Sequence, residues 1–231
     1  MSDAARPAFY ALRPGGWRDY VTLLHWPYTL WHLSYVAIGA ALAPQMKWGL
    51  LGWTVLAFLL AMGVGAHALD ELQGRPLRTR IPDRVLIGFA AASIVAACTI
   101  GVVVATRTTL WLLAFVGFGG FVVVAYNLEL FGGALHGDVW FAVTWGAFPV
   151  LTAYFASAER LRADAVAAAV FAALVSLAQR HLSTDARRVR RSGGAPPAGA
   201  ETLLQGPETA LRLLSAALPV LAGALLLMRA G

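Results

Sequence analysis

Apolar residues in this chain come in long runs that are separated by short polar segments. A helix that crosses a bilayer needs roughly 20 mostly apolar residues, and several runs approach that length. The runs cover residues 22–43, 48–69, 85–105, 109–127, 138–156, 164–182 and 209–228. The pattern predicts an all-α fold, a polytopic membrane bundle of about seven transmembrane helices, in which residues 1–231 form one integral membrane domain.

Two segments outside these runs have a different character. Residues 1–20 are polar, contain two prolines and have no early apolar core, so we expect an N-terminal tail rather than a signal peptide. Residues 192–207, SGGAPPAGAETLLQGP, are rich in glycine, proline and alanine. That composition predicts a flexible loop before the last helix.

Composition supports the membrane interpretation and excludes other classes. Hydrophobic residues make up 59% of the chain and charged residues 13%, whereas soluble domains carry about 25% charged residues. A soluble enzyme, a nucleic-acid-binding protein and a disordered tail are therefore all excluded. The net charge of +6 comes from arginines that flank the apolar runs, and such placement is typical of membrane topology.

The distribution of basic residues predicts the orientation. The N-terminal tail, the loop after the second run and the region after the sixth run together hold 12 lysines and arginines, against 5 on the other side. Positive residues favour the cytoplasm, so we expect a cytoplasmic N-terminus and an external C-terminus. Arginine and alanine are abundant and Lys47 is the only lysine, which indicates a GC-rich bacterial genome and hence a bacterial plasma (inner) membrane.

The first polar cluster follows the second run, in GVGAHALDELQGRPLRTRIPD. His67, Asp70 and Glu71 are spaced i, i+3 and i+4 and share a helix face. Carboxylates suit Mg²⁺ or Mn²⁺, and a histidine also admits Zn²⁺ or Fe. The arginines that follow suit an anionic head group or a diphosphate; they are Arg75, Arg78, Arg80 and Arg84. The alternative is a helix end with its charges in the membrane interface.

Two further clusters follow the fourth and sixth runs, on the same predicted side. The loop YNLELFGGALHGDVW contains Tyr126, Asn127, Glu129, His136 and Asp138 and has no basic residue. Its acidity indicates metal or cation coordination, or a merely interfacial loop. The segment AQRHLSTDARRVRR contains Arg180, His181 and Asp185. Its arginines either bind phosphate groups or only set the topology.

The first apolar run carries His25 and His32, seven residues and about two helical turns apart. Trp26, Tyr28 and Tyr35 surround them in the sequence. Such residues can line a pocket, although an aromatic belt at the membrane interface is the commoner explanation.

This layout resembles the UbiA-type superfamily of intramembrane prenyltransferases. The first acidic motif of that family is N-x-x-x-D-x-x-x-D, followed closely by a stretch such as T-x-R-P-x-P. In AHALDELQG, Asp70 matches the first motif aspartate, Ala66 stands in place of the asparagine and Gly74 replaces the second aspartate. Thr79, Arg80 and Pro82 resemble the trailing element. The resemblance covers roughly residues 20–190.

The resemblance implies an Mg²⁺-dependent, cytoplasm-facing site for a prenyl (isoprenoid) diphosphate. Asp70 and Tyr126 would be catalytic, and the metal ligands would be His67, Asp70, Glu71 and Asp185. The residues implied to bind the substrate and its diphosphate are Arg75, Arg78, Arg80, Asn127, His136, Asp138, Arg180 and His181.

Several positions depart from the family pattern. The second acidic motif is reduced to Asp185, no lysine or arginine occurs between Thr108 and Glu159, and seven apolar runs stand where the family has nine spans. Three hypotheses follow. The chain is a divergent transferase acting on an isoprenoid diphosphate, a non-catalytic protein of the same fold that binds a lipid or quinone or serves as a partner subunit, or a membrane enzyme with a histidine and carboxylate metal centre.

Overall fold

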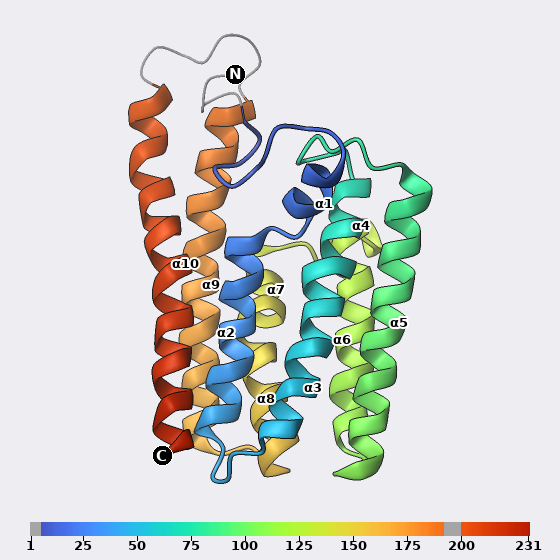
Figure 1. Cartoon of the computed structure of the whole chain (residues 1–231), viewed down its shortest axis with the longest axis vertical. Helices are drawn as coiled ribbons and strands as arrows, with labels where there is room; N and C mark the ends of the chain where they lie inside the picture. The colour runs from blue at the N-terminus through green and yellow to red at the C-terminus, as the bar shows by residue number, and fades with distance from the viewer. Residues whose placement is uncertain (1–5, 192–199) are drawn as a thin grey trace.

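The computed structural model describes residues 6–191 and 200–231, and this part of the chain contains helices but no β-strand. The helices lie side by side in one elongated bundle (Figure 1). The prediction of an all-α bundle is confirmed. Each of the seven predicted apolar runs contains helical residues.

Several apolar runs fold into more than one helical segment, and the bounds are as follows. The first part of the chain forms α1 (Trp17–Leu23), α2 (Trp26–Leu42), α3 (Trp48–Phe58), a π-helix η2 (Leu59–Ala66) and α4 (His67–Leu72). The middle forms α5 (Asp83–Arg107), α6 (Leu112–Asn127) and a short 3₁₀ turn η3 (Phe131–Gly133). The last part forms α7 (Asp138–Phe141), a second π-helix η4 (Ala142–Ala147), α8 (Phe148–Ala158), α9 (Ala163–Arg191) and α10 (Ala200–Ala230).

Within the described residues, five helices are long and apolar enough to cross a membrane. They are Trp48–Leu72, Asp83–Arg107, Asp138–Ala158, Ala163–Arg190 and Thr202–Ala230. The helix α6 is apolar but has 16 residues, and α2 has 17. The chain therefore has the composition and the helix lengths of an integral membrane protein.

Two predicted boundaries differ from the structure. The first run is not one helix, because His25 adopts a left-handed conformation (φ 45°) between α1 and α2, and Pro27 begins a new helix. The predicted loop 192–207 is also partly helical, since α10 begins at Ala200. Leu204 on α10 is buried against Ala186 and Val189 of α9, so packing there outweighs the glycine and proline content. Residues 192–199 of that predicted loop lie outside the described residues.

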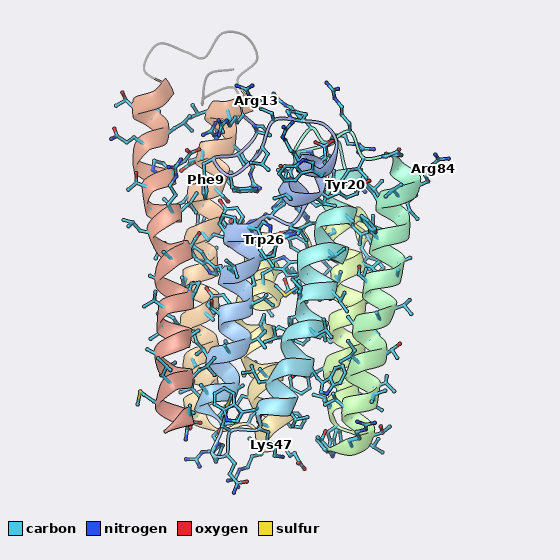
Figure 2. All side chains as sticks on the ribbon, viewed as in Figure 1. Phe9, Arg13, Tyr20, Trp26, Lys47 and Arg84 are labelled. Carbon is cyan, nitrogen blue, oxygen red and sulfur yellow. The ribbon has the colours of Figure 1, made fainter. Side chains whose placement is uncertain are left out.

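The arginines are concentrated at one end of the bundle. Arg13 and Arg84 lie at this arginine-rich end, and Lys47 lies at the opposite end (Figure 2). The C-terminus of α10 is at the opposite end, whereas α1 and α4 are at the arginine-rich end (Figure 1). These labelled basic residues therefore lie at the ends of the bundle to which the count of lysines and arginines in the sequence assigns them.

Two glycines allow helices to approach most closely. A Cβ atom at Gly39 of α2 would overlap the backbone of Val150 in α8, and one at Gly146 of η4 would overlap the backbone of Ala172 in α9. Backbone atoms cannot move aside as a side chain can. In a bilayer, close packing of small residues is a main source of helix association, so these contacts fix α8 and α9 around α2.

Substitution of Gly39 by alanine is predicted to destabilise the bundle by about 1–3 kcal/mol, because the added methyl group collides with backbone. The matched control is Gly49→Ala in α3, where an added Cβ meets no atom within 4 Å. Thermal unfolding of the detergent-solubilised variants, followed by size-exclusion chromatography, measures the difference. Equal melting temperatures for the two variants would contradict the close contact.

Candidate functional site

A polar cavity opens at the arginine-rich end of the bundle. Its volume is about 200 Å³, and because one water needs at least 10–15 Å³ in this measure, it has room for roughly a dozen waters or a polar head group. The walls come from the N-terminal segment, α2, η2, α4, α6, α7, η4, α9 and α10. The polar and aromatic side chains of the lining include Tyr10, His25, Tyr28, His32, His67, Asp70, Tyr126, Asn127, His136, Gln179, Arg180 and Arg187.

The two π-helices border this cavity, and each offers a backbone carbonyl to a histidine. His67 at the start of α4 bonds through Nδ1 to the Gly63 carbonyl oxygen at 3.2 Å, and His32 of α2 bonds through Nδ1 to the Trp145 carbonyl oxygen at 2.8 Å. A π-helical turn is wider than an α-helical one and often marks a functional site. Because a carbonyl can only accept, the hydrogen lies on Nδ1 in both rings.

His25 lies at the centre of an aromatic group beside the cavity. Its ring stacks on His67, with the centroids 3.9 Å apart, and its Nδ1 hydrogen-bonds the Tyr10 hydroxyl at 3.1 Å. Burial raises the pKa of the Tyr10 phenol well above its usual value, so this hydroxyl keeps its proton. The left-handed backbone at His25 is uncommon for a non-glycine residue, and such backbone is typical of a site that the surrounding fold holds in place.

Arg180 binds three groups around the second predicted cluster. Its Nε donates to Asp138 Oδ1 at 2.5 Å, its Nη1 donates to the Tyr126 hydroxyl and its Nη2 donates to the His136 carbonyl oxygen at 3.1 Å. His136 in turn bonds through Nδ1 to the Tyr126 carbonyl oxygen at 3.0 Å. The ends of α6 and α9 and the loop between α6 and α7 are thus held together by one guanidinium group.

The structure brings some of the residues predicted from sequence into the cavity. Asp70 and His67 from the first cluster, Tyr126, Asn127 and His136 from the second, and Arg180 from the third all line it. Asp138 joins them through Arg180, and the His181 imidazole lies 4.0 Å from Asp138 at the surface. The catalytic and binding roles of these residues remain predictions.

Other predicted residues have different partners. The predicted loop arginines Arg75, Arg78 and Arg80 are absent from the lining, and Arg75 is bound to the Ile81 carbonyl oxygen and to Asp83. Asp185 is exposed and pairs with Arg188 at 3.1 Å. These side chains belong to the surface of the arginine-rich end.

Glu71 has a structural role that the sequence interpretation did not include. Its side chain is fully buried, one carboxylate oxygen accepts the backbone N–H of Leu77, and the other accepts both the N–H and the hydroxyl of Thr79. These bonds hold the loop after α4, where Gly74, Arg75 and Arg78 have positive φ. Glu71 therefore fastens this loop, and both of its oxygens are already occupied.

The predicted metal ligands do not form one cluster. In the part of the chain that the structure describes, no group of three or more His, Cys, Asp and Glu side chains is arranged to hold a metal ion. Glu71 is bound to the loop after α4, and Asp185 lies at the surface. Of the four predicted metal ligands, His67 and Asp70 therefore line the cavity without Glu71 and Asp185. The residues present do not fit the Mg²⁺ site that the resemblance implies.

Several lining residues were not identified from the sequence as site residues. Tyr10 belongs to the predicted tail, and Gln179 and Arg187 lie on α9 either side of Ser183, which also lines the cavity. The positions 179, 183 and 187 repeat every four residues, so they share one helix face. That spacing was the available signal. His25 and His32 line the cavity as well, as the pocket interpretation of these two residues expects.

Replacement of Glu71 by glutamine is predicted to lower stability by about 2 kcal/mol, since the amide NH₂ group would face a buried N–H donor that loses its acceptor. Asp185→Asn is the control, because an exposed i, i+3 pair contributes little. Thermal unfolding of both variants is the measurement. A Glu71→Gln variant as stable as Asp185→Asn would argue against the buried carboxylate as the anchor of this loop.

Comparison with protein families, with curated proteins and with solved structures finds no match to this chain. The cavity is therefore interpreted from its own residues. These are stacked and carbonyl-bound histidines, tyrosines, one carboxylate from α4 and arginines from α9, at the arginine-rich end of a membrane bundle.

Proposed function

We propose that this chain is a UbiA-like protein of the bacterial plasma membrane that crosses the bilayer seven times, with its N-terminus in the cytoplasm and its C-terminus outside. Five helices long enough to span and the 12-to-5 division of basic residues support this topology. Local thinning of the bilayer and snorkelling of flanking residues accommodate helices as short as α2 and α6. The polar cavity then opens toward the cytoplasm.

Reporter fusions test this topology. Fusions after residue 162 and at residue 231 are predicted to report the external side, and a fusion after residue 78 the cytoplasmic side, because the arginine-rich loops stay inside. An enzyme reporter active only outside, paired with a fluorescent protein active only inside, gives both answers. A cytoplasmic signal at residue 231 would contradict an odd number of crossings.

We propose that the cavity binds a membrane lipid with a phosphate-containing head, an isoprenoid phosphate or diphosphate being the class that the UbiA resemblance implies. The observation that carries this proposal is that two cavities adjoin. A second, apolar cavity of about 90 Å³ lies between α3, α5, α6 and α8, and it meets the polar one at a junction where Met62 and Trp145 line both. A polar cavity that adjoins an apolar one suits an amphipathic molecule.

The apolar cavity is too small to enclose a long isoprenoid tail. Its outer wall indicates where the remainder of the tail would lie. Trp53 lines it and is half exposed on the side of the bundle. A tail that passes Met62 and Trp145 would therefore continue past Trp53 into the surrounding lipid. Burial of each additional CH₂ group contributes about 0.8 kcal/mol, so tail length should govern affinity.

Arg187 supports a phosphate at the mouth of the cavity. It is exposed, lines the cavity and donates to the Thr184 hydroxyl at 3.2 Å, a neutral partner. The other two arginines of the lining are bound to carboxylates, Arg180 to Asp138 and Arg190 to Glu208. The charge of Arg187 is therefore the one best suited to a phosphate.

Transfer of the prenyl group is the reaction that the resemblance implies, with Asp70 and Tyr126 as the catalytic residues. A second candidate is a non-catalytic lipid-binding protein of the same fold. The arrangement of the carboxylates favours that second candidate, because Glu71, Asp138 and Asp185 are each bound to protein groups. Departure of a diphosphate normally requires a cluster of charges that neutralises it.

Binding of geranylgeranyl thiolodiphosphate to the purified protein in nanodiscs distinguishes the two candidates. If the protein is a transferase with a metal-dependent site, the ligand binds more tightly in the presence of Mg²⁺ than in the presence of a chelator. The Asp70→Asn variant then loses this Mg²⁺-dependent increase in affinity. A lipid-binding protein binds equally well in both conditions. Absence of binding in either condition would contradict the proposed function itself.

Met62→Trp is predicted to weaken binding of geranylgeranyl thiolodiphosphate at least about tenfold, since a larger side chain closes the junction and removes tail burial. Dimethylallyl thiolodiphosphate, whose tail is too short to reach past the junction, should lose little. Val95→Trp is the matched control, because Val95 is exposed on α5 and lines neither cavity. Equal losses for the long and short ligands would contradict a tail path through Met62.

A further inference from the structure

Two buried polar atoms in the wall of the polar cavity have no hydrogen-bond partner among the described residues. Gln179 is buried, with 4% of its surface exposed, and its Oε1 has no hydrogen-bond partner among the described residues. The buried Nε2 atom of His25 likewise has none. Both residues line the cavity. Unsatisfied buried polar atoms are costly and rare in native structures, so each requires an explanation.

The other three cavity histidines present acceptor nitrogens. His32, His67 and His136 each give the Nδ1 hydrogen to a backbone carbonyl, so Nε2 of each neutral ring is a lone pair. Among the described residues, the Nε2 atoms of these three histidines form no hydrogen bond to a protein atom. The same tautomer at three positions is therefore set by the fold.

Neutral rings are what this arrangement favours. The His25 and His67 rings stack 3.9 Å apart, so two positive charges there would repel each other strongly. The cations that line the same cavity are Arg180, Arg187 and Arg190. A neutral imidazole beside them acts as an acceptor through Nε2 and not as a further positive charge.

Gln179 and the exposed Arg187 lie at different depths along α9. Gln179 is eight residues from Arg187 on the same helix face, which corresponds to about 12 Å along the axis. Arg187 is near the arginine-rich end, and Gln179 is further into the bundle. A bare phosphate or diphosphate offers mainly acceptor oxygens, so it matches Arg187 but not the inner wall.

We infer that the head group that this cavity recognises carries hydroxyl groups in addition to its phosphate: the phosphate lies at Arg187 and the hydroxyls donate to Gln179 and to the Nε2 atoms of His32, His67 and His136. The ligand class is a lipid phosphodiester with a polyol head. Aromatic rings beside the acceptors, among them Tyr28 and Phe141, give such a head an apolar surface to lie against. This inference rests on the proposed lipid-binding function.

A matched pair of lipids tests the inference. One is the geranylgeranyl phosphodiester of glycerol and the other is the geranylgeranyl phosphodiester of propanol, which has the same charge and tail but lacks two hydroxyls. Wild-type protein in nanodiscs should bind the glycerol ester at least about tenfold more tightly, because the propanol ester leaves buried acceptors unpaired. Equal affinities would overturn the inference.

Two variants assign the selectivity to the inner wall. Gln179→Met keeps the side-chain length and removes the amide, so the preference for the glycerol ester should fall several-fold while affinity for the propanol ester stays unchanged. That unchanged affinity also shows that the variant is folded. His181→Phe is the control, because His181 is exposed and does not line the cavity. A preference that survives Gln179→Met intact would overturn the assignment of hydroxyls to this wall.

Geranylgeranyl thiolodiphosphate separates failure of this inference from failure of the proposed function. If it binds while the two esters bind equally or not at all, the hydroxyl recognition is wrong and lipid binding stands. If none of the three ligands binds, both proposals are overturned. Tight, selective binding of the glycerol ester supports both.

Discussion

Backbone groups within a bilayer must find partners inside the protein, since the hydrocarbon offers none. This constraint controls the two segments where the bundle departs from regular α-helix. At η2 the Gly63 carbonyl receives the His67 ring, and at η4 the Trp145 carbonyl receives the His32 ring. Histidine is suited to this task because one nitrogen can satisfy the backbone while the other stays available. The wide turns and the histidines around the cavity therefore depend on each other.

A second constraint acts at the arginine-rich end, where the described loops are fixed without a β-sheet or a disulfide. Buried carboxylates perform this function. Glu71 holds the loop after α4, and Asp19 accepts the N–H of Gly15 and the N–H of Arg80, so it ties the N-terminal segment to the same loop. A carboxylate that accepts several backbone N–H groups forms charge-assisted bonds, which are stronger than neutral ones.

The sequence predicted the helical class and the end at which polar residues gather, because length, hydropathy and the placement of charged residues determine these properties directly. Asp70, Tyr126, His136 and Arg180 were also identified, since ionisable residues near apolar runs are conspicuous. The partner of each side chain was not predictable. Glu71 and Asp70 are neighbours in sequence, yet a turn of about 100° between them sends one into a loop and the other to the cavity. Tyr10 and Gln179 were missed because contacts distant in sequence bring them to the site.

The helix α10 is attached to its neighbours at both of its ends. Near the arginine-rich end, Arg190 of α9 and Glu208 of α10 form a buried ion pair with a 2.6 Å contact, and at the far end Arg229 donates to the carbonyl oxygens of Ala41 and Ala43 after α2. To part α10 from its neighbours would strand buried charge at one end and free carbonyls at the other. This flank is therefore a fixed wall. On the proposed lipid-binding function, a lipid that enters or leaves the interior would pass through the other side of the bundle, where the half-exposed Trp53 lines the apolar cavity.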